Sequence, residues 1–436
     1  MSTHTNRREF LKSTTLAAGG FWVAGTCAAA ESRSPNEKLN VGIIGVNGRG
    51  RANLGGVSGE NIVALCDIDE SYLAAAAAKF PQAKTYIDWR KMLDQKDLDA
   101  VTVSTADQVH ALASNWALKR GISVYCEKPL AHSVHEARTV RETYVQNKNK
   151  VATQMGTQIH AGDNFRRVVE LIQSKVIGEV REVHAWCGRH GPGGGLPEGE
   201  DPLPPHLNWD LWLGPAPFRP YNKSYLPGNL TWNRWWDFGN GTLGDMGSHV
   251  IDLPFWALKL RQPTSIETHG DPTPASPYTN AKWMEITWEH PATDERPALT
   301  LTWHDGIKRP ESPDEKIDLN TWGLGMLFKG EKGDLLADYG KHILLPEEKF
   351  KDFQRPEPSI PASLGHHQEW IHACKTGEPT TCNFDYSGML IEHNLLGNVA
   401  YRTGKKLIWD PDNLKATNCP EADPFIRREY REGWTL

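Results

Sequence analysis

The sequence predicts an α/β fold with two unlike halves. A doubly wound parallel sheet comes first, and an α/β domain with an open, mainly antiparallel sheet follows. Short apolar strand patterns alternate with helical patterns up to about residue 155, as they do in parallel sheets. From residue 156 onwards, strand patterns outnumber helical ones and follow one another directly. The chain has 436 residues, 39% of them apolar and 23% charged, which is enough for two such globular domains.

Residues 1–30 are expected to be an export signal and not part of the fold. A pair of arginines, Arg7 and Arg8, precedes a moderately apolar run that ends in small residues. This arrangement resembles a twin-arginine signal, which exports proteins that have already folded. We therefore expect a periplasmic protein. A lipid anchor at Cys27 is not expected, because the residue before it, Thr26, fits a lipidation motif poorly.

A glycine-rich turn follows the first strand pattern of the body, at residues 39–46. The turn contains Gly45, Asn47, Gly48, Arg49 and Gly50. A turn of this kind, between a strand and a helix, directs backbone N–H groups at the pyrophosphate of a dinucleotide. Asn47 stands where the usual motif has glycine, but asparagine tolerates a left-handed backbone, so we expect the turn to survive.

An acidic residue, Asp67, ends the second strand pattern at residues 61–66. In dinucleotide-binding folds the acid at this distance accepts hydrogen bonds from the ribose hydroxyls. An acid there also favours NAD over NADP, because it would repel a 2′-phosphate. Arg49 and Arg51 lie nearby and keep NADP possible. Together these features predict a dinucleotide-binding Rossmann domain at residues 38–155.

The rest of this half continues the alternation of helices and strands. Ser133 and Glu136 form a capping box at the start of one helix, and Asp88 can cap another that ends near Asp94. The other expected elements, in order, are a helix at 71–80, a strand at 99–105, a helix at 108–119, a strand at 122–126 and a strand at 151–154.

The second domain is expected to cover residues 156–436. A Pro- and Gly-rich stretch at 191–228 is expected to be an extended surface segment, residues 346–363 another loop, and the last thirty residues irregular. Strands are expected at 180–187, 264–269, 281–289, 298–304, 322–329 and 333–338. Helices are expected at 163–174, 247–260, 365–375 and 387–402.

Several motifs in order make the chain resemble the Gfo/Idh/MocA family of oxidoreductases over residues 38–405. Besides the glycine turn and Asp67, they are Ser104-Thr105 with His110, Glu127-Lys128-Pro129, and Asp245-Met246-Gly247-Ser248-His249 with Asp252. One departure is Ala106, where the family usually has proline. The resemblance implies a cofactor site formed by Gly45, Asn47, Gly48, Arg49, Gly50, Asp67, Thr105, His110, Glu127, Lys128 and Gln158.

Three residues are candidates for the chemistry: Lys128, Asp245 and His249. Lys128 follows a strand at its carboxyl end, where open α/β sheets bind ligands. Asp245 and His249 are four residues apart and share one face of a helix, so the carboxylate could orient the imidazole. By themselves these would be a surface lysine and a structural Asp–His pair. The resemblance places all three over the nicotinamide, with His249 as the proton acceptor and Lys128 sharing or replacing that role.

Substrate contacts are harder to predict. Arg166 lies just after the sixth strand, where relatives often contact cofactor or substrate. Trp235 and Trp236 could stack on a sugar ring, although for either one of them core packing is an equal expectation in a chain with 17 tryptophans. No pair of cysteines has zinc-type spacing, and we expect no metal.

The resulting expectation is an NAD(P)-dependent oxidoreductase that acts on a hydroxyl of a sugar, polyol or glycoside. Because NAD is scarce outside the cytoplasm, an exported enzyme should hold its cofactor tightly and recycle it within each catalytic cycle. Two alternatives stay open: a redox-neutral NAD-dependent glycosidase, and a non-enzymatic sugar-binding protein on the same fold. The net charge of −6 argues against nucleic-acid binding, and no apolar stretch in the body is long enough to span a membrane. The resemblance implies a homodimer or homotetramer.

Overall fold

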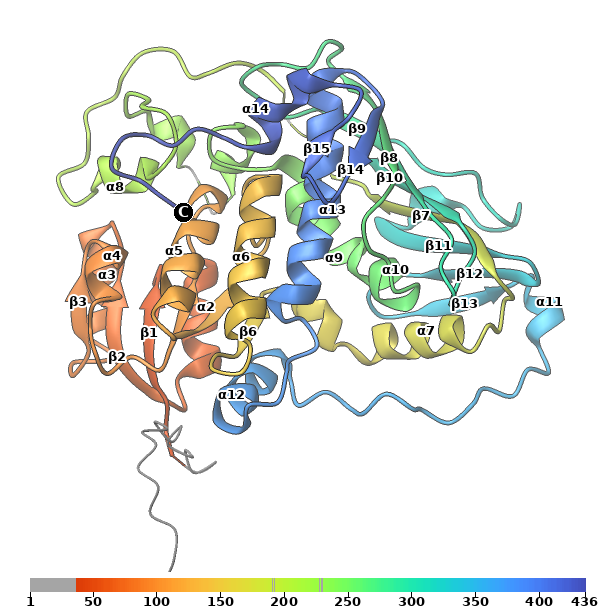
Figure 1. The fold of residues 1–436 in the computed structure, drawn as a ribbon, viewed down its shortest axis with the longest axis horizontal. Helices are drawn as coiled ribbons and strands as arrows, with labels where there is room; N and C mark the ends of the chain where they lie inside the picture. Colours follow the sequence, from red (N-terminus) through yellow and green to blue (C-terminus); the bar gives the residue numbers. More distant parts are fainter. Residues whose placement is uncertain (1–36, 190, 192, 227, 229) are drawn as a thin grey trace, which may run out of the picture. The chain divides into compact units, whose positions relative to one another are not determined.

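A parallel sheet forms the first half of the protein (Figure 1). The computed structural model describes residues 37–189, 191, 193–226, 228 and 230–436, so the expected export signal lies outside the described residues. The sheet has six strands in the order β3-β2-β1-β4-β5-β6, and every neighbouring pair is parallel. Its strands are β1 (Asn40–Ile44), β2 (Asn61–Cys66), β3 (Lys84–Tyr86), β4 (Ala100–Val103), β5 (Ser123–Cys126) and β6 (Thr153–Met155). The strand order reverses between β1 and β4, which creates a crevice at the carboxyl ends of these strands.

The helices of this half begin at the residues that the sequence marks as caps. The side chain of Asp69 accepts hydrogen bonds from the first turn of α3, and Ser133 and Glu136 form the complete capping box of α6. Asp88 caps α4, which ends at Met92 and is shorter than expected. The helices are α2 (Arg49–Val57), α3 (Glu70–Ala77), α4 (Trp89–Met92), α5 (Asp107–Lys119) and α6 (Val134–Asn147).

A mixed sheet of nine strands forms the second half, in the order β13-β12-β11-β7-β10-β9-β8-β14-β15. The β7–β10 pair is parallel, and the other neighbouring pairs are antiparallel. Burial alternates along β9, as expected for a sheet with one face on the core. The strands are β7 (Val180–Cys187), β8 (Ser265–Asp271), β9 (Trp283–His290), β10 (Leu299–Asp305), β11 (Leu324–Gly330), β12 (Gly333–Ala337), β13 (His342–Leu345), β14 (Leu407–Asp410) and β15 (Lys415–Ala416).

The long helix α13 joins the two halves. It packs against α6 of the first half and against β8 of the second, and Figure 1 shows it between them. The fold class predicted from the sequence is therefore confirmed. Among the described residues, no helix combines the length and apolar character needed to cross a bilayer. The remaining helices are α7 (Asp163–Gln173), α8 (Trp209–Leu213), α9 (Ser248–Val250), α10 (Asp252–Ala257), α11 (Glu347–Phe350), α12 (His366–Thr376), α13 (Phe384–Thr403) and α14 (Asp423–Ile426).

Local structure differs from the prediction in three places. The helix expected at 247–260 is divided into α9 and α10 and follows a π-helical turn at Leu243–Gly247. The strands β3, β13, β14 and β15 were not predicted, because each has only two to four residues, too few to show a periodic pattern. The prediction that the last thirty residues are irregular is wrong in part, since β14, β15 and α14 lie there.

The largest difference concerns the stretch predicted as an extended surface segment. Its residues 204–226, which we call the cover segment, contain α8 and buried aromatic side chains. Trp209, Tyr221 and Tyr225 belong to a cluster that also includes Trp232 and Trp235. Periodicity missed this packing because the aromatic residues are spaced irregularly between prolines. The segment is therefore packed into an aromatic cluster that it shares with residues 232–238.

The turn between β1 and α2 gives a direct test of the fold. A methyl group on Gly50 would overlap the carbonyl oxygen of Gly45, whereas Gly55 in the same helix faces open space. We expect Gly50→Ala to lower the thermal midpoint and to weaken nucleotide binding, because the helix can no longer approach the strand. Gly55→Ala, the matched control, should stabilise α2 by about 0.5–1 kcal/mol. Equal midpoints for the two variants would contradict this packing.

Candidate active site

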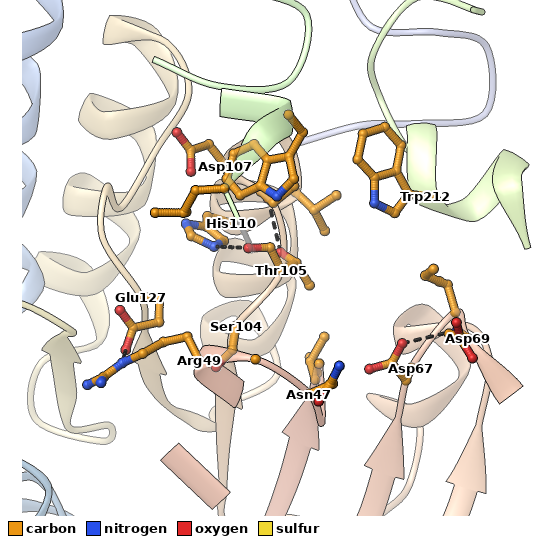
Figure 2. A pocket seen from close by; sticks show the side chains of 18 of the residues that line it. Asn47, Arg49, Asp67, Asp69, Ser104, Thr105, Asp107, His110, Glu127 and Trp212 are labelled. Carbon is orange, nitrogen blue, oxygen red and sulfur yellow. Dashed lines mark hydrogen bonds and ion pairs between the residues drawn. The ribbon is translucent and has the colours of Figure 1, made fainter. Parts of the chain in front are cut away.

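A cavity of about 780 Å³ opens at the carboxyl ends of β1, β2, β4 and β5. Its floor is formed by the turns that follow these strands, and its far wall by the cover segment (Figure 2). Asp67 lines one end, and Lys128, Asp245 and His249 also line the cavity. The structure thus gathers in one cavity residues that lie almost 200 positions apart in the sequence.

The glycine turn has the geometry needed for a phosphate group. Gly45 and Gly48 have positive φ angles of 83° and 55°. A methyl group on Gly45 would strike the backbone of Ser104 on the neighbouring strand. Asn47 is not among the residues with positive φ, so the left-handed backbone expected for it is not needed. Gly50 does not line the cavity and instead allows α2 to pack closely on the turn.

The carboxylate of Asp67 is held in place at the ribose end of the cavity. It accepts hydrogen bonds from the backbone N–H groups of Val46, at 2.9 Å, and Asp69, at 3.0 Å. Burial raises the pKa of this carboxyl, although the backbone donors oppose the shift. Figure 2 shows Asp67 and Asp69 side by side on this side of the cavity.

Backbone hydrogen bonds tie the cover segment to the loop that carries Asp67. The N–H of Glu70 donates to the carbonyl of His206, and that of Asn208 to the carbonyl of Ile68, both at 2.9 Å. Farther along, the side-chain amide of Gln108 donates to the carbonyl of Trp212 at 3.0 Å. Trp212 faces the cavity across from Asp67 (Figure 2). A nucleotide in the cavity would therefore be enclosed from both sides.

Glu127 is the centre of a polar network beneath the cavity. Its Oε1 accepts hydrogen bonds from Arg49 Nε at 3.0 Å, Asn53 Nδ2 at 2.9 Å and Gln158 Nε2 at 3.0 Å. Arg49, Glu127 and Gln158 line the cavity, as predicted, but much of their hydrogen bonding is to one another. The arginine therefore points toward β5 and away from the ribose end, so it does not offset the acid at Asp67.

Lys128 forms an ion pair with Asp245, and Arg189 pairs with the other oxygen of the same carboxylate at 2.7 Å. Burial alone would raise the pKa of the Asp245 carboxyl, but the charges of Lys128 and Arg189 outweigh burial and lower it. The sequence analysis expected Asp245 to orient His249. The structure corrects this, because the carboxylate binds the two cations instead. The Lys128–Pro129 peptide bond is cis.

His249 receives its orientation from Thr157. The threonine hydroxyl donates to the carbonyl of Ser248 at 3.1 Å, so its oxygen must accept from Nδ1 of His249, also at 3.1 Å. This fixes the proton on Nδ1 and leaves Nε2 as a free acceptor. Burial, with the nearby charge of Lys128, lowers the pKa of the imidazole to about 4. The ring is therefore neutral at physiological pH.

Asp107 is a second buried carboxyl in the cavity, and the sequence analysis missed it. It is the first residue of α5, and it accepts long hydrogen bonds of 3.3 and 3.5 Å from the backbone and side-chain nitrogens of Asn240. Burial raises its pKa to about 8, although Lys128 lies close enough to oppose the shift. The signal available in the sequence was its position directly after β4, two residues beyond Thr105.

His110 and Thr105 connect the turns of the cavity. The ring nitrogens of His110 lie 2.7 Å from the carbonyl of Pro129 and 3.0 Å from that of Thr105. Because both nitrogens already contact backbone, His110 fixes the position of the Lys128–Pro129 turn. Figure 2 shows its contact with Thr105. It lines the cavity as predicted, and its visible contacts are structural.

The structure does not bring the three predicted substrate residues to the cavity. Arg166 donates to the carbonyls of His160 and Pro361 and lies within 5.7 Å of the ring of Trp256. The indole N–H groups of Trp235 and Trp236 donate to backbone carbonyls, and both rings are buried. We therefore remove these three from the substrate contacts. The aromatic residues that do line the cavity include Trp212, Tyr221 and Trp232.

One buried cluster has residue types that can bind metals. Donor atoms of His160, Asp252 and Cys382 lie within 4.8 Å of one another. The carboxylate of Asp252, however, already accepts from His160 Nδ1 at 2.9 Å and from the hydroxyl of Tyr386 at 2.6 Å. These hydrogen bonds occupy the atoms that a cation would need, so we assign the cluster to the hydrogen bonding of the core.

Comparison with known families matches both halves of the chain. Residues 39–155 match a family described as "Oxidoreductase family, NAD-binding Rossmann fold", under the name GFO_IDH_MocA. Residues 184–436 match the companion "Oxidoreductase family, C-terminal alpha/beta domain". The two matches cover the dinucleotide-binding turn, the catalytic candidates and the mixed sheet.

Individual relatives are more distant. An "Inositol 2-dehydrogenase" of Salmonella typhimurium is 31% identical over 169 residues, which are 38% of this chain and 49% of the relative. A "Glycosyl hydrolase family 109 protein" of Solibacter usitatus is 28% identical over 203 residues, 40% of this chain and 44% of the relative. The chain thus spans about half the length of the curated relatives it matches.

Solved structures share the fold at low identity. The WlbA dehydrogenase from Bordetella pertussis, in complex with NADH and UDP-GlcNAcA, has a TM-score of 0.58 and 16% identity, covering 86% of this chain and 99% of that one. The myo-inositol 2-dehydrogenase from Lactobacillus plantarum has a TM-score of 0.55 and 15% identity, covering 86% and 100%. These likenesses support the fold of both halves.

The buried carboxyl of Asp107 gives a prediction about stability. With a folded pKa of about 8 and an unfolded value of about 4, the folded state holds a proton that the unfolded chain releases, so this group lowers stability as the pH rises from 4 to 8. The free energy of unfolding falls by at most about 1.4 kcal/mol per pH unit in this range. Asp107→Asn removes the titration, so the thermal midpoint of the variant should exceed that of the wild type increasingly up to pH 8. Exposed Asp294 provides the control, Asp294→Asn. A constant difference across pH would show that Asp107 is ionised in the folded protein.

Proposed function

Because the chain belongs to the Gfo/Idh/MocA family of oxidoreductases, we propose that it is an NAD-dependent enzyme that oxidises a hydroxyl of a sugar, polyol or glycoside. We further propose that the cofactor stays bound and is returned to its starting redox state in each cycle. The observation that carries the proposal is the convergence of Lys128, Asp245 and His249 in the cavity that begins at the glycine turn.

The residues of the cavity fit NAD. The turn at Gly45–Gly48 would hold the pyrophosphate, since side chains are excluded there by the close backbone of Ser104. Asp67 would accept the ribose hydroxyls of the adenosine end. The carboxylates of Asp67 and Asp69 would repel a 2′-phosphate, and Arg49 is engaged by Glu127. We therefore favour NAD over NADP.

Bound NAD would supply the acceptor for the hydride from the carbinol carbon. The residues of this chain would manage the proton of the substrate hydroxyl. Nε2 of His249 carries a lone pair that can accept a proton, because Thr157 holds the ring proton on Nδ1. The ammonium of Lys128, held by Asp245, would polarise the substrate oxygen and favour its loss of a proton. His249 is therefore the proposed proton acceptor and Lys128 the electrostatic partner.

The protonated carboxyl of Asp107 would add a neutral hydrogen-bond donor beside Lys128. With a pKa of about 8, it carries no charge at pH 7. A neutral carboxyl can donate to a substrate oxygen without cancelling the positive charge of the lysine. We include Asp107 as a substrate-orienting residue of the proposed site.

Retention of the cofactor is supported by the cover segment. Backbone hydrogen bonds to Ile68 and Glu70 and an aromatic cluster hold the segment in place as a wall of the cavity, so this wall is formed before a nucleotide binds. The proposed twin-arginine export in folded form, and a periplasmic location, would make such retention necessary. We further propose that the chain divides into domains at residues 38–155 and 156–436. We also propose that it forms a homodimer or homotetramer.

A redox-neutral glycosidase is the second candidate. The relative named as a glycosyl hydrolase matches part of this chain, and the same residues could remove a hydroxyl proton for a transient oxidation. The two functions differ in what accumulates: free reducing sugar without net NADH for the glycosidase, and reduced cofactor or a second reduced product for the dehydrogenase.

The test is a single turnover with the cofactor that the purified protein carries. A panel of inositols, aldoses and glycosides is mixed anaerobically with the enzyme, and the near-ultraviolet absorbance of reduced nicotinamide is followed. At least one substrate should produce up to one reduced cofactor per chain, and a second, oxidised sugar should reverse the signal. Release of reducing sugar from a glycoside without this signal would favour the glycosidase.

Two variants connect the signal to the site. His249→Asn should slow reduction by about 10²-fold or more, because it removes the proton acceptor. Lys128→Met should do the same while keeping the nucleotide, since Asp245 retains Arg189 as a partner. Arg181→Gln is the control, because this exposed arginine lies outside the cavity in a surface ion pair with Glu331, and it should leave the rate unchanged. Wild-type rates in both active-site variants would exclude the proposed roles.

A further inference from the structure

A second cavity, of about 230 Å³, lies between α6, α13 and α14. It shares no lining residue with the nucleotide cavity in the described part of the chain. Its walls include Arg402 and Asn398 of α13, His132 just before α6, and Trp236. Among the described residues, Arg402 and the side-chain oxygen of Asn398 have no hydrogen-bond partner, so the cavity is built for something other than apolar packing.

Arg402 presents an unpaired cation to this cavity. Its guanidinium lies 5.0 Å from the ring of Trp236 and 4.1 Å from that of Phe425. Within the described residues no hydrogen bond or ion pair reaches it. Burial lowers the pKa of Arg402 to about 10, and Asp237 only partly opposes this, being itself paired with Arg219 at 2.8 Å. A partly buried cation of this kind needs acceptors to offset its loss of hydration.

Two neighbouring side chains also have polar atoms without a hydrogen bond of normal geometry. Both ring nitrogens of His132 are of this kind, although the backbone of Gly239 lies close enough to the ring to influence its pKa. The side-chain oxygen of Asn398 is buried and unpaired, although its amide nitrogen donates to the carbonyl of Asn240 at 3.1 Å. A cavity with an unpaired cation and further polar atoms that lack a hydrogen bond of normal geometry indicates a site for a polar ligand.

The other charges around the cavity are compensated or exposed. Arg428 pairs with Glu136 at 2.7 Å and donates to the carbonyl of Gln108. Glu429 is exposed to solvent, where its charge is screened. The uncompensated group that faces the interior is therefore the guanidinium of Arg402.

We propose that this cavity binds a small oxyanion, a carboxylate or a phosphate, on Arg402. The planar guanidinium has five N–H donors in a fork that matches two oxygens of such an anion. Trp236 and Phe425 hold the guanidinium of Arg402 in one position, so this side chain loses little conformational entropy when the anion binds. The volume is several times that of a water molecule, which takes up about 30 Å³ in the liquid, and it suits an ion of a few heavy atoms.

The test is isothermal titration calorimetry of the full mature protein with inorganic phosphate, acetate and succinate in separate experiments. Saturable binding of one ion per chain is expected for at least one probe. Comparison of the phosphate titration with the acetate and succinate titrations shows whether the site prefers phosphate or carboxylate. Arg402→Gln should weaken that binding by about tenfold or more, because the charge-assisted hydrogen bonds are lost. Arg402→Lys keeps the charge and the stem and should weaken it less.

Two controls separate this site from others. Arg181 is an exposed arginine in a surface ion pair with Glu331, so Arg181→Gln should leave the affinity unchanged. Lys128→Met alters the nucleotide cavity and should also leave it unchanged, which keeps this result independent of the proposed function. Circular dichroism confirms folding of each variant, and Arg402→Lys carries the test if Arg402→Gln does not fold. Absence of saturable binding by all three probes, or equal affinity in both Arg402 variants and the wild type, would overturn the proposal.

Discussion

The buried ion pair between Lys128 and Asp245 is the interaction on which the candidate site depends. Both side chains are largely shielded, with exposed fractions of 14% and 9%. A buried charge that loses its partner costs about 3–5 kcal/mol, so the pair constrains the two elements that carry it. Lys128 follows β5 of the parallel sheet, and Asp245 lies in the π-helical turn that precedes α9. The two halves of the protein must therefore meet at this point, and the turn after β5 is further held by His110.

The charge of Lys128 and the burial of the site together determine the protonation states of His249 and Asp107. The cation of Lys128 lowers the pKa of the His249 imidazole and opposes the rise at Asp107, while burial dominates both shifts. A neutral imidazole, a neutral carboxyl and a carboxylate paired with Lys128 and Arg189 therefore coexist at neutral pH. A site of this composition can accept a proton and hold an oxygen without a large net charge. Asn240, which contacts Asp107 and Asn398, connects this site with the second cavity.

Much of the architecture could be predicted because local patterns determine it. The apolar strands of the parallel sheet, the glycine turn and the capping box of α6 are each short-range signals, and the structure confirms them. The order of motifs also placed Lys128, Asp245 and His249 together. Long-range packing could not be predicted in the same way. Nothing in the local sequence shows that Trp235 is buried while Trp212 faces the cavity, or that the proline-rich cover segment is packed into an aromatic cluster.

Partner choice within the site was equally hidden from the sequence. The spacing of Asp245 and His249 suggested a pair, yet a π-helical turn changes the local geometry and the carboxylate binds Lys128 and Arg189 instead. Thr157, which orients His249, comes from a different element 92 positions away. Asp107 is at the start of a helix, where an exposed aspartate is common, so its role becomes visible only once its burial is known. These features follow from tertiary contacts between halves, which periodicity does not encode.

The proposed retention of NAD in the cavity above the glycine turn can be measured directly. The purified protein, prepared without added nucleotide, is denatured, and the molecules that it releases are identified and counted. We expect about one NAD or NADH per chain, bound tightly enough to survive purification. Release of no nucleotide, together with no binding when NAD is titrated into the protein, would contradict it and favour a non-enzymatic role for the fold.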